Sequence, residues 1–123
     1  MLSDERREQL SELEQVLGYR FHELELLNEA LTHKSYIHEC RAYTPNNERM
    51  EFLGDAVLGL VISDHGYRTF VDRAEGDLSK LRAALVNEGT LERIARRLGL
   101  GQYLLLGRGE EYTGGAREAI AAR

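Results

Sequence analysis

The chain has 123 residues, of which 30% are charged and 42% hydrophobic, and its formal net charge is −5 at pH 7. This length fits one domain with a core of its own and is short for two. The sequence contains no run of eighteen apolar residues and no signal-peptide core at its N-terminus, so it predicts a soluble, cytoplasmic protein without a membrane segment. Its single cysteine, Cys40, cannot form a disulfide within the chain.

The negative net charge argues against a nucleic-acid-binding protein when it is taken alone. Carboxylates that bind metal ions, however, contribute negative charge when they are counted empty. The basic residues are also grouped locally, as at Arg93, Arg96 and Arg97. Charge therefore does not decide the class of partner.

The composition predicts an all-α chain, because it has one proline and few alternating β-branched runs. Apolar residues at helical spacing predict helices over 4–17, about 23–33, 47 to about 67–70, about 77–87 and 90–99. Gly18 ends the first helix, and Gly99 with Gly101 ends the last. Pro45 places 37–46 in a loop. The apolar run 103–106 is too short to assign, 107–115 is predicted to be a loop, and 117–123 resembles the first turns of another helix.

The helix that begins near residue 47 carries the most informative pattern. At about 100° per residue, Glu48, Glu51 and Asp55 fall within an arc of roughly 60°. Apolar side chains cover nearly every other direction, which is typical of a buried helix. Because an unpaired buried carboxylate is costly, such groups normally acquire a cation, a metal or a proton. The stripe therefore predicts a divalent-metal site.

A purely structural role remains open for Glu48. If Asn46 or Asn47 is the N-cap, Glu48 lies in the first turn, where the helix dipole favours a negative charge. That explanation is weaker for Glu51 and fails for Asp55, which lies two turns into the helix.

Four segments together resemble the ribonuclease III family of double-stranded-RNA endonucleases. Segment 47–58, NERMEFLGDAVL, closely resembles the family signature. The flanking segments are similar to the family's other motifs and occur in the same order: ALTHKSY at 30–36, EGDLSKLRA at 75–83, and LGRGE at 106–110 with TGG at 113–115.

The resemblance implies an all-α endonuclease domain that forms a homodimer and cleaves double-stranded RNA during RNA processing, for instance of ribosomal RNA precursors. It implies that Glu51 and Asp55 ligate Mg²⁺, with Mn²⁺ as a possible substitute, and are catalytic. It places Glu48 and Glu75 at the same cleft in contact with substrate, and Phe52 across the dimer interface. Mg²⁺ prefers hard oxygen ligands, and duplex RNA is read through its shape, phosphates and 2′-hydroxyls.

The sequence departs from the family pattern in two places. Residues 1–123 correspond to the catalytic domain, without the double-stranded-RNA-binding domain that the family usually appends. By register, Arg123 stands where the family has the Asp of a second acidic pair, so we expect a C-terminally truncated domain that lacks its last helices and is a crippled nuclease. Two alternatives follow: a catalytically silent family member that dimerises or binds duplex RNA weakly, and a helical oligomerisation domain with structural carboxylates.

Overall fold

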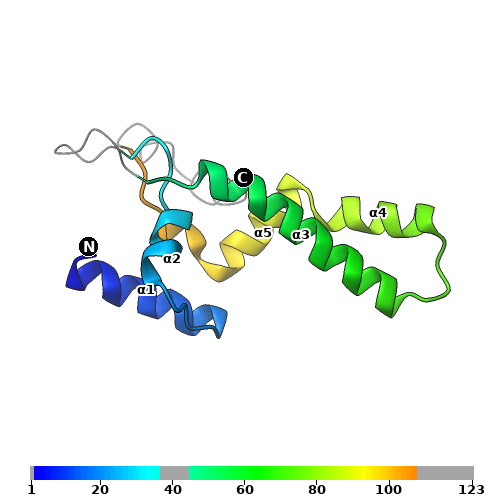
Figure 1. Ribbon diagram of the computed structural model, residues 1–123, viewed down its shortest axis with the longest axis horizontal. Coiled ribbons are helices and arrows are strands. Elements are labelled where there is room, and N and C mark those ends of the chain that lie inside the picture. Colours follow the sequence, from blue (N-terminus) through cyan, green and yellow to red (C-terminus); the bar gives the residue numbers. More distant parts are fainter. Residues whose placement is uncertain (1, 37–44, 108–123) are drawn as a thin grey trace.

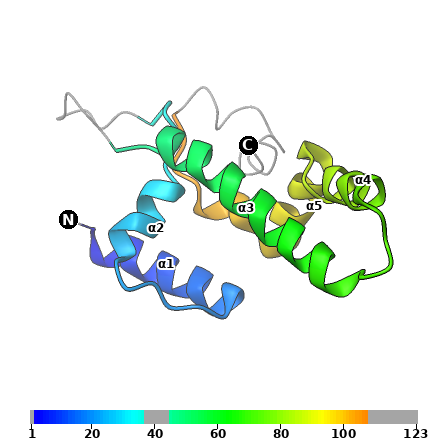
Figure 2. The same ribbon diagram turned by 45° about the vertical axis from the view of Figure 1, so that its right-hand side comes forward.

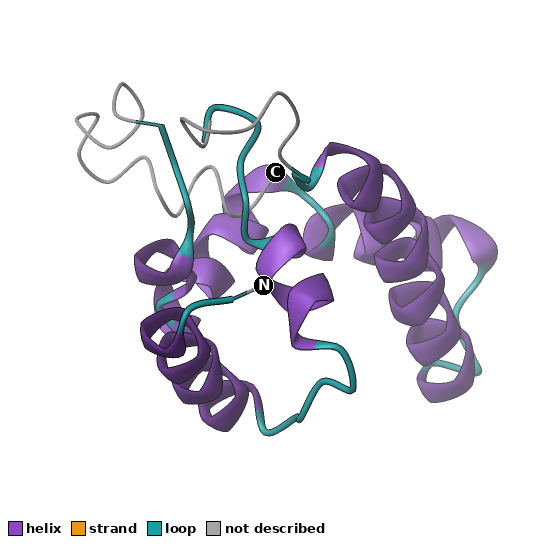
Figure 3. Ribbon diagram, turned by 60° about the vertical axis from the view of Figure 1, so that its left-hand side comes forward, coloured by secondary structure: helices purple, strands orange, loops and turns teal. Residues whose placement is uncertain are grey.

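The computed structural model describes residues 2–36 and 45–107, which fold into helices joined by short loops (Figure 1). The helices are α1 (Asp4–Leu17), α2 (Leu24–Ala30), α3 (Glu48–Thr69), α4 (Glu75–Leu85), α5 (Glu88–Leu98) and the 3-10 helix η1 (Leu100–Tyr103). Within these ranges, extended pairing is limited to a single parallel bridge between Thr32 and Leu105. The all-α prediction is confirmed (Figure 3).

The core lies between α1, α2 and the segment that contains η1. Its buried apolar side chains are Leu10, Leu13, Leu27, Leu31, Tyr103, Leu104 and Leu106. The run 103–106, which the sequence left unassigned, thus supplies three core residues. It is too short to show a helical or strand period, so its burial depends on contacts with residues about 70 to 100 positions away in the chain.

A buried arginine holds this core together. Arg6 donates hydrogen bonds from Nε to Asn28 Oδ1 at 2.7 Å, from one terminal nitrogen to Gln9 Oε1 at 3.0 Å, and from the other to the Tyr103 carbonyl at 2.8 Å. These bonds join α1 to α2 and to η1. Burial lowers the pKa of the Arg6 guanidinium from its ordinary value, because the charged form loses solvation.

Helix α1 begins and ends as the sequence predicts. The Ser3 hydroxyl accepts a hydrogen bond from the Arg6 amide, and Gly18 ends the helix with φ of 69°, in the left-handed region. Helix α5 likewise ends at Gly99, whose φ is also 69°.

Helix α2 is shorter than the predicted 23–33, and the reason is a tertiary one. The backbone after Ala30 leaves the helix because it pairs with the segment after η1. Leu105 donates its amide hydrogen to the Leu31 carbonyl, and His33 donates to the Leu105 carbonyl. Local propensity could not reveal a partner so distant in sequence.

The prediction that α3 is buried is wrong for the single chain. Of its residues, only Gly66 is buried, whereas the Phe52 side chain is 83% exposed. In its C-terminal half, α3 packs against α4, and Gly66 faces Leu78 and Leu81 there. The two helices lie side by side and project away from α1 and α2 (Figures 1 and 2). None of the helices described here is long and apolar enough to cross a membrane.

Candidate functional site

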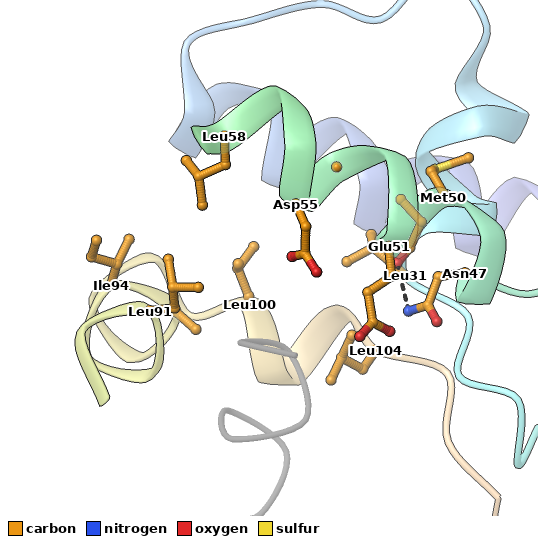
Figure 4. A pocket seen from close by; sticks show the side chains of 13 residues that line it. Leu31, Asn47, Met50, Glu51, Asp55, Leu58, Leu91, Ile94, Leu100 and Leu104 are labelled. Atoms are coloured by element: carbon orange, nitrogen blue, oxygen red, sulfur yellow. Dashed lines mark hydrogen bonds between the residues drawn. The ribbon is translucent and has the colours of Figure 1, made fainter. Parts of the chain in front are cut away.

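Glu51 and Asp55 point into the same pocket, which lies between α3 and the segment that connects α5 to the core (Figure 4). The pocket has a volume of about 360 Å³. Apart from α3 itself, its walls are mostly apolar and come from α5, η1 and the two bridged segments: Leu31, Leu91, Ile94, Leu100 and Leu104. The two carboxylates are thus the charged groups in a lining that, apart from Asn47, is otherwise apolar.

The two carboxylates lie on the same face of α3 because they are four residues apart. Residues four apart on a helix lie on one face, with Cβ atoms about 5–6 Å apart. Neither Glu51 nor Asp55 makes a side-chain hydrogen bond or an ion pair with any residue that the structure describes, and both are exposed to solvent. Two unpaired carboxylates beside one another repel, and a cation between them would remove that repulsion.

The donor set fits a hydrated Mg²⁺ ion. In the ranges 2–36 and 45–107, no group of three or more potential ligands gathers at one place, so Glu51 and Asp55 stand as a pair. Mg²⁺ is commonly bound through one or two carboxylates and keeps several waters. By register, the Asp of the family's second acidic pair corresponds to Arg123, which lies outside the described residues.

Glu48 does not join the pocket. Its carboxylate lies 3.4 Å from Lys34 Nζ, and both side chains are exposed. Its amide donates to Asn46 Oδ1 at 3.1 Å, which places it in the capped first turn of α3. This arrangement agrees with the structural alternative for Glu48. Its predicted contact with substrate stays a prediction.

Glu75 also lies away from Glu51 and Asp55. It begins α4, whereas the sequence predicted that this helix starts at about residue 77. Its side chain accepts a hydrogen bond from Ser79 and lines a second pocket with Ser63 and Arg82, near the C-terminal end of α3. The single chain therefore does not bring Glu75 to the cleft of Glu51, and a shared site would need a second chain.

Phe52 lies outside the pocket, on an exposed apolar part of α3. The side chains of this surface, which we call the α3 apolar stripe, are between 50% and 83% exposed: Phe52, Leu53, Val57, Leu60 and Val61. At about 100° per residue, all five fall within half of the helix circumference, and Glu51 and Asp55 fall in the other half. One helix thus carries a carboxylate face and an apolar face.

Sequence reasoning missed Asn47 and the far wall of the pocket. Asn47 lines the pocket and hydrogen-bonds to the Ala30 carbonyl (Figure 4). Leu104 reaches the pocket from the unassigned run 103–106. The sequence suggested Asn47 as a helix N-cap and gave no sign of its tertiary contact. No local pattern pointed to Leu104.

Comparison with known proteins agrees with this architecture. Residues 23–122 match the family model described as ribonuclease-III-like. The chain belongs to the ribonuclease III-like family. It is 51% identical to ribonuclease 3 of Borreliella afzelii over 113 residues and 56% identical to that of Syntrophobacter fumaroxidans over 111 residues. These matches cover 92% and 89% of the chain but 46% of each relative, so the chain spans about half the length of these curated relatives.

A solved structure supports the family fold. It is described as showing structural flexibility in a region involved in dimer formation of the nuclease domain of ribonuclease III from Campylobacter jejuni. The match has a TM-score of 0.74 and 48% sequence identity, and it covers 89% of this chain and 80% of that one. The predicted ribonuclease III fold is therefore confirmed, and the roles of individual site residues stay predictions.

Proposed function

We propose that this chain forms a metal-dependent endonuclease site for double-stranded RNA. The observation that carries the proposal is the pair of carboxylates, Glu51 and Asp55, that face one pocket on the helix bearing the family signature and have no ion-pair or hydrogen-bond partner within residues 2–36 and 45–107. The ribonuclease 3 relatives and the ribonuclease-III-like family match support the same class of activity.

Glu51 and Asp55 would hold Mg²⁺ or Mn²⁺, and such an ion can activate water and stabilise charge on a phosphodiester during its displacement. The chain's own contribution is to fix both carboxylates on one rigid helix at a spacing of one turn. The apolar wall of Leu100 and Leu104 keeps one side of the pocket free of competing charge. Duplex RNA would approach from the open side and be recognised by its shape and phosphates.

We also propose that two copies pair through the α3 apolar stripe. A soluble monomer rarely leaves large contiguous apolar surface uncovered, and Phe52 is the most exposed large apolar side chain of this stripe. Symmetric dimers bury one patch against its own copy. The dimer-forming region named for the Campylobacter jejuni nuclease domain supports this part of the proposal.

The test is cleavage of a duplex RNA by the chain in Mg²⁺ or Mn²⁺, compared with the same reaction in EDTA and with Asp55→Asn. Metal-dependent cleavage that Asp55→Asn abolishes would support the endonuclease. Binding of duplex RNA without cleavage would favour the catalytically silent alternative. A chain that binds neither metal nor duplex RNA would leave the helical oligomerisation domain.

A further inference from the structure

Asn47 directly precedes α3, yet its side chain does not cap the helix. Asn is among the preferred N-cap residues because its side chain usually accepts a hydrogen bond from the first turn. Here that role belongs to Asn46, whose Oδ1 accepts from the Glu48 amide at 3.1 Å, and Asn47 makes no side-chain capping bond. The position of Asn47 thus has another cause.

Asn47 instead ties the start of α3 to the end of α2. Its Nδ2 donates to the Ala30 carbonyl at 3.0 Å, and its backbone amide donates to the Thr32 carbonyl at 2.9 Å. The last carbonyls of a helix have no partner within that helix, so Ala30 needs a donor from elsewhere. At position 47 the amide of Asn can donate to this carbonyl. A carboxylate has no hydrogen to donate, and a Ser hydroxyl is too short to reach it.

The same residue is linked to a pocket carboxylate. The Asn47 carbonyl accepts a hydrogen bond from the Glu51 amide at 2.7 Å. This bond belongs to the first turn of α3, which carries the Glu51 side chain. On the other side, the hydrogen bond from the Leu105 amide to the Leu31 carbonyl joins the end of α2 to the segment that carries Leu104. The carboxylate face and the opposite apolar wall are therefore connected through Asn47.

We infer that Asn47 is a positioning residue, which holds Glu51 at a fixed place relative to the apolar wall so that Glu51 and Asp55 can share one hydrated divalent cation. This inference rests on the proposed metal site. Residues that orient metal ligands through hydrogen bonds typically change metal affinity or activity 10- to 100-fold when they are replaced. Its role is assigned through these hydrogen bonds and not as a ligand of the cation.

The test uses Asn47→Ser and the matched control Asn46→Ser in the full chain. Both changes leave the net charge unaltered and introduce Ser, which is favoured at a helix N-terminus. Only Asn47→Ser removes the donor to the Ala30 carbonyl. Asn47→Asp is a second variant, which keeps the shape and replaces the donor with an acceptor. Mn²⁺ affinity is measured by titration calorimetry, and amide hydrogen exchange is measured in the metal-free chain.

We expect Asn47→Ser to bind Mn²⁺ about 10- to 100-fold more weakly than the parent, with Asn46→Ser within about twofold. Exchange of the Glu51 amide should accelerate at least about tenfold, while the core amides of Leu10 and Leu13 keep their protection. Acceleration at every amide would indicate a purely structural role and overturn the inference. Equal Mn²⁺ affinity in Asn47→Ser and the parent would also overturn it.

Two further outcomes separate this inference from the proposed function. A parent chain that binds no Mn²⁺ refutes the metal site itself, and hydrogen exchange then decides whether Asn47 holds the first turn of α3. If Asn47→Ser fails to fold, Asn47→Asp is measured in the same way. Unfolding of both variants would assign Asn47 to the stability of the fold and overturn its role in positioning.

Discussion

Replacing Asp55 with Asn should separate metal binding from folding. The change keeps the size of the side chain, and Asp and Asn have similar helix propensities. Asp55 makes no ion pair or side-chain hydrogen bond with a described residue, so the change breaks no such bond within residues 2–36 and 45–107. The change lowers the number of carboxylates in the pocket from two to one.

The structure sets the size of both effects. Two unit charges about 6 Å apart in water repel by about 0.7 kcal/mol, and both carboxylates are exposed, so the water value applies. The free energy of unfolding of Asp55→Asn should therefore stay the same or rise by less than about 1 kcal/mol. Mn²⁺ affinity should fall at least about tenfold, which corresponds to about 1.4 kcal/mol.

The assay is Mn²⁺ titration calorimetry, together with urea unfolding of the same preparations. Asp64→Asn is the matched control, because Asp64 lies on the same helix but pairs with Arg68 at the surface. It should leave Mn²⁺ affinity unchanged and cost at most about 0.5 kcal/mol of stability. If Asp55→Asn and Asp64→Asn bound Mn²⁺ equally well, the pocket would not be the metal site.

Three further predictions test the interface and the core. Phe52→Ala should raise the dimer dissociation constant at least about 30-fold in sedimentation equilibrium, because a buried aromatic anchor contributes about 2 kcal/mol or more to an interface; a parent that is monomeric at tens of micromolar would contradict the dimer. Arg6→Ala leaves buried acceptors without donors and should lower the free energy of unfolding by about 2–4 kcal/mol, whereas the exposed Arg7→Ala should change it by less than about 1 kcal/mol. Gly107→Ala would drive a Cβ into the Ser35 carbonyl oxygen and should cost about 1–3 kcal/mol in urea unfolding; an unchanged midpoint would show that the loop adapts.

The sequence predicted those features that depend on residues close together in the chain. Helix α1, with its end at Gly18, and the long α3 follow from apolar spacing and from the conformational freedom of glycine. The facing of Glu51 and Asp55 follows from a spacing of four residues on any helix. The family resemblance rested on local motifs too, and the family match confirms it.

Features that depend on distant contacts could not be predicted in this way. The early end of α2 is set by pairing of Leu31 and His33 with Leu105, more than 70 residues away. Glu75 lies away from the pocket of Glu51 and Asp55 because of the direction in which α4 follows α3, and no local residue pattern predicts that direction. In each case the deciding partner lies outside the window over which a helical period can be recognised.

The exposure of α3 follows from its two faces. Its apolar pattern predicted burial, and the single chain leaves Phe52 and its neighbours in water. The physical argument about the residues still holds, because apolar side chains around a helix require a cover. Helix α4 and the segments that line the pocket cover part of α3. A second copy would cover the α3 apolar stripe. Because Glu51 and Phe52 are adjacent on one rigid helix, an interface formed through the apolar stripe would also fix the orientation of both carboxylate pairs. The proposed dimer and the proposed metal site would then both follow from the same signature sequence, and Phe52→Ala and Asp55→Asn test them separately.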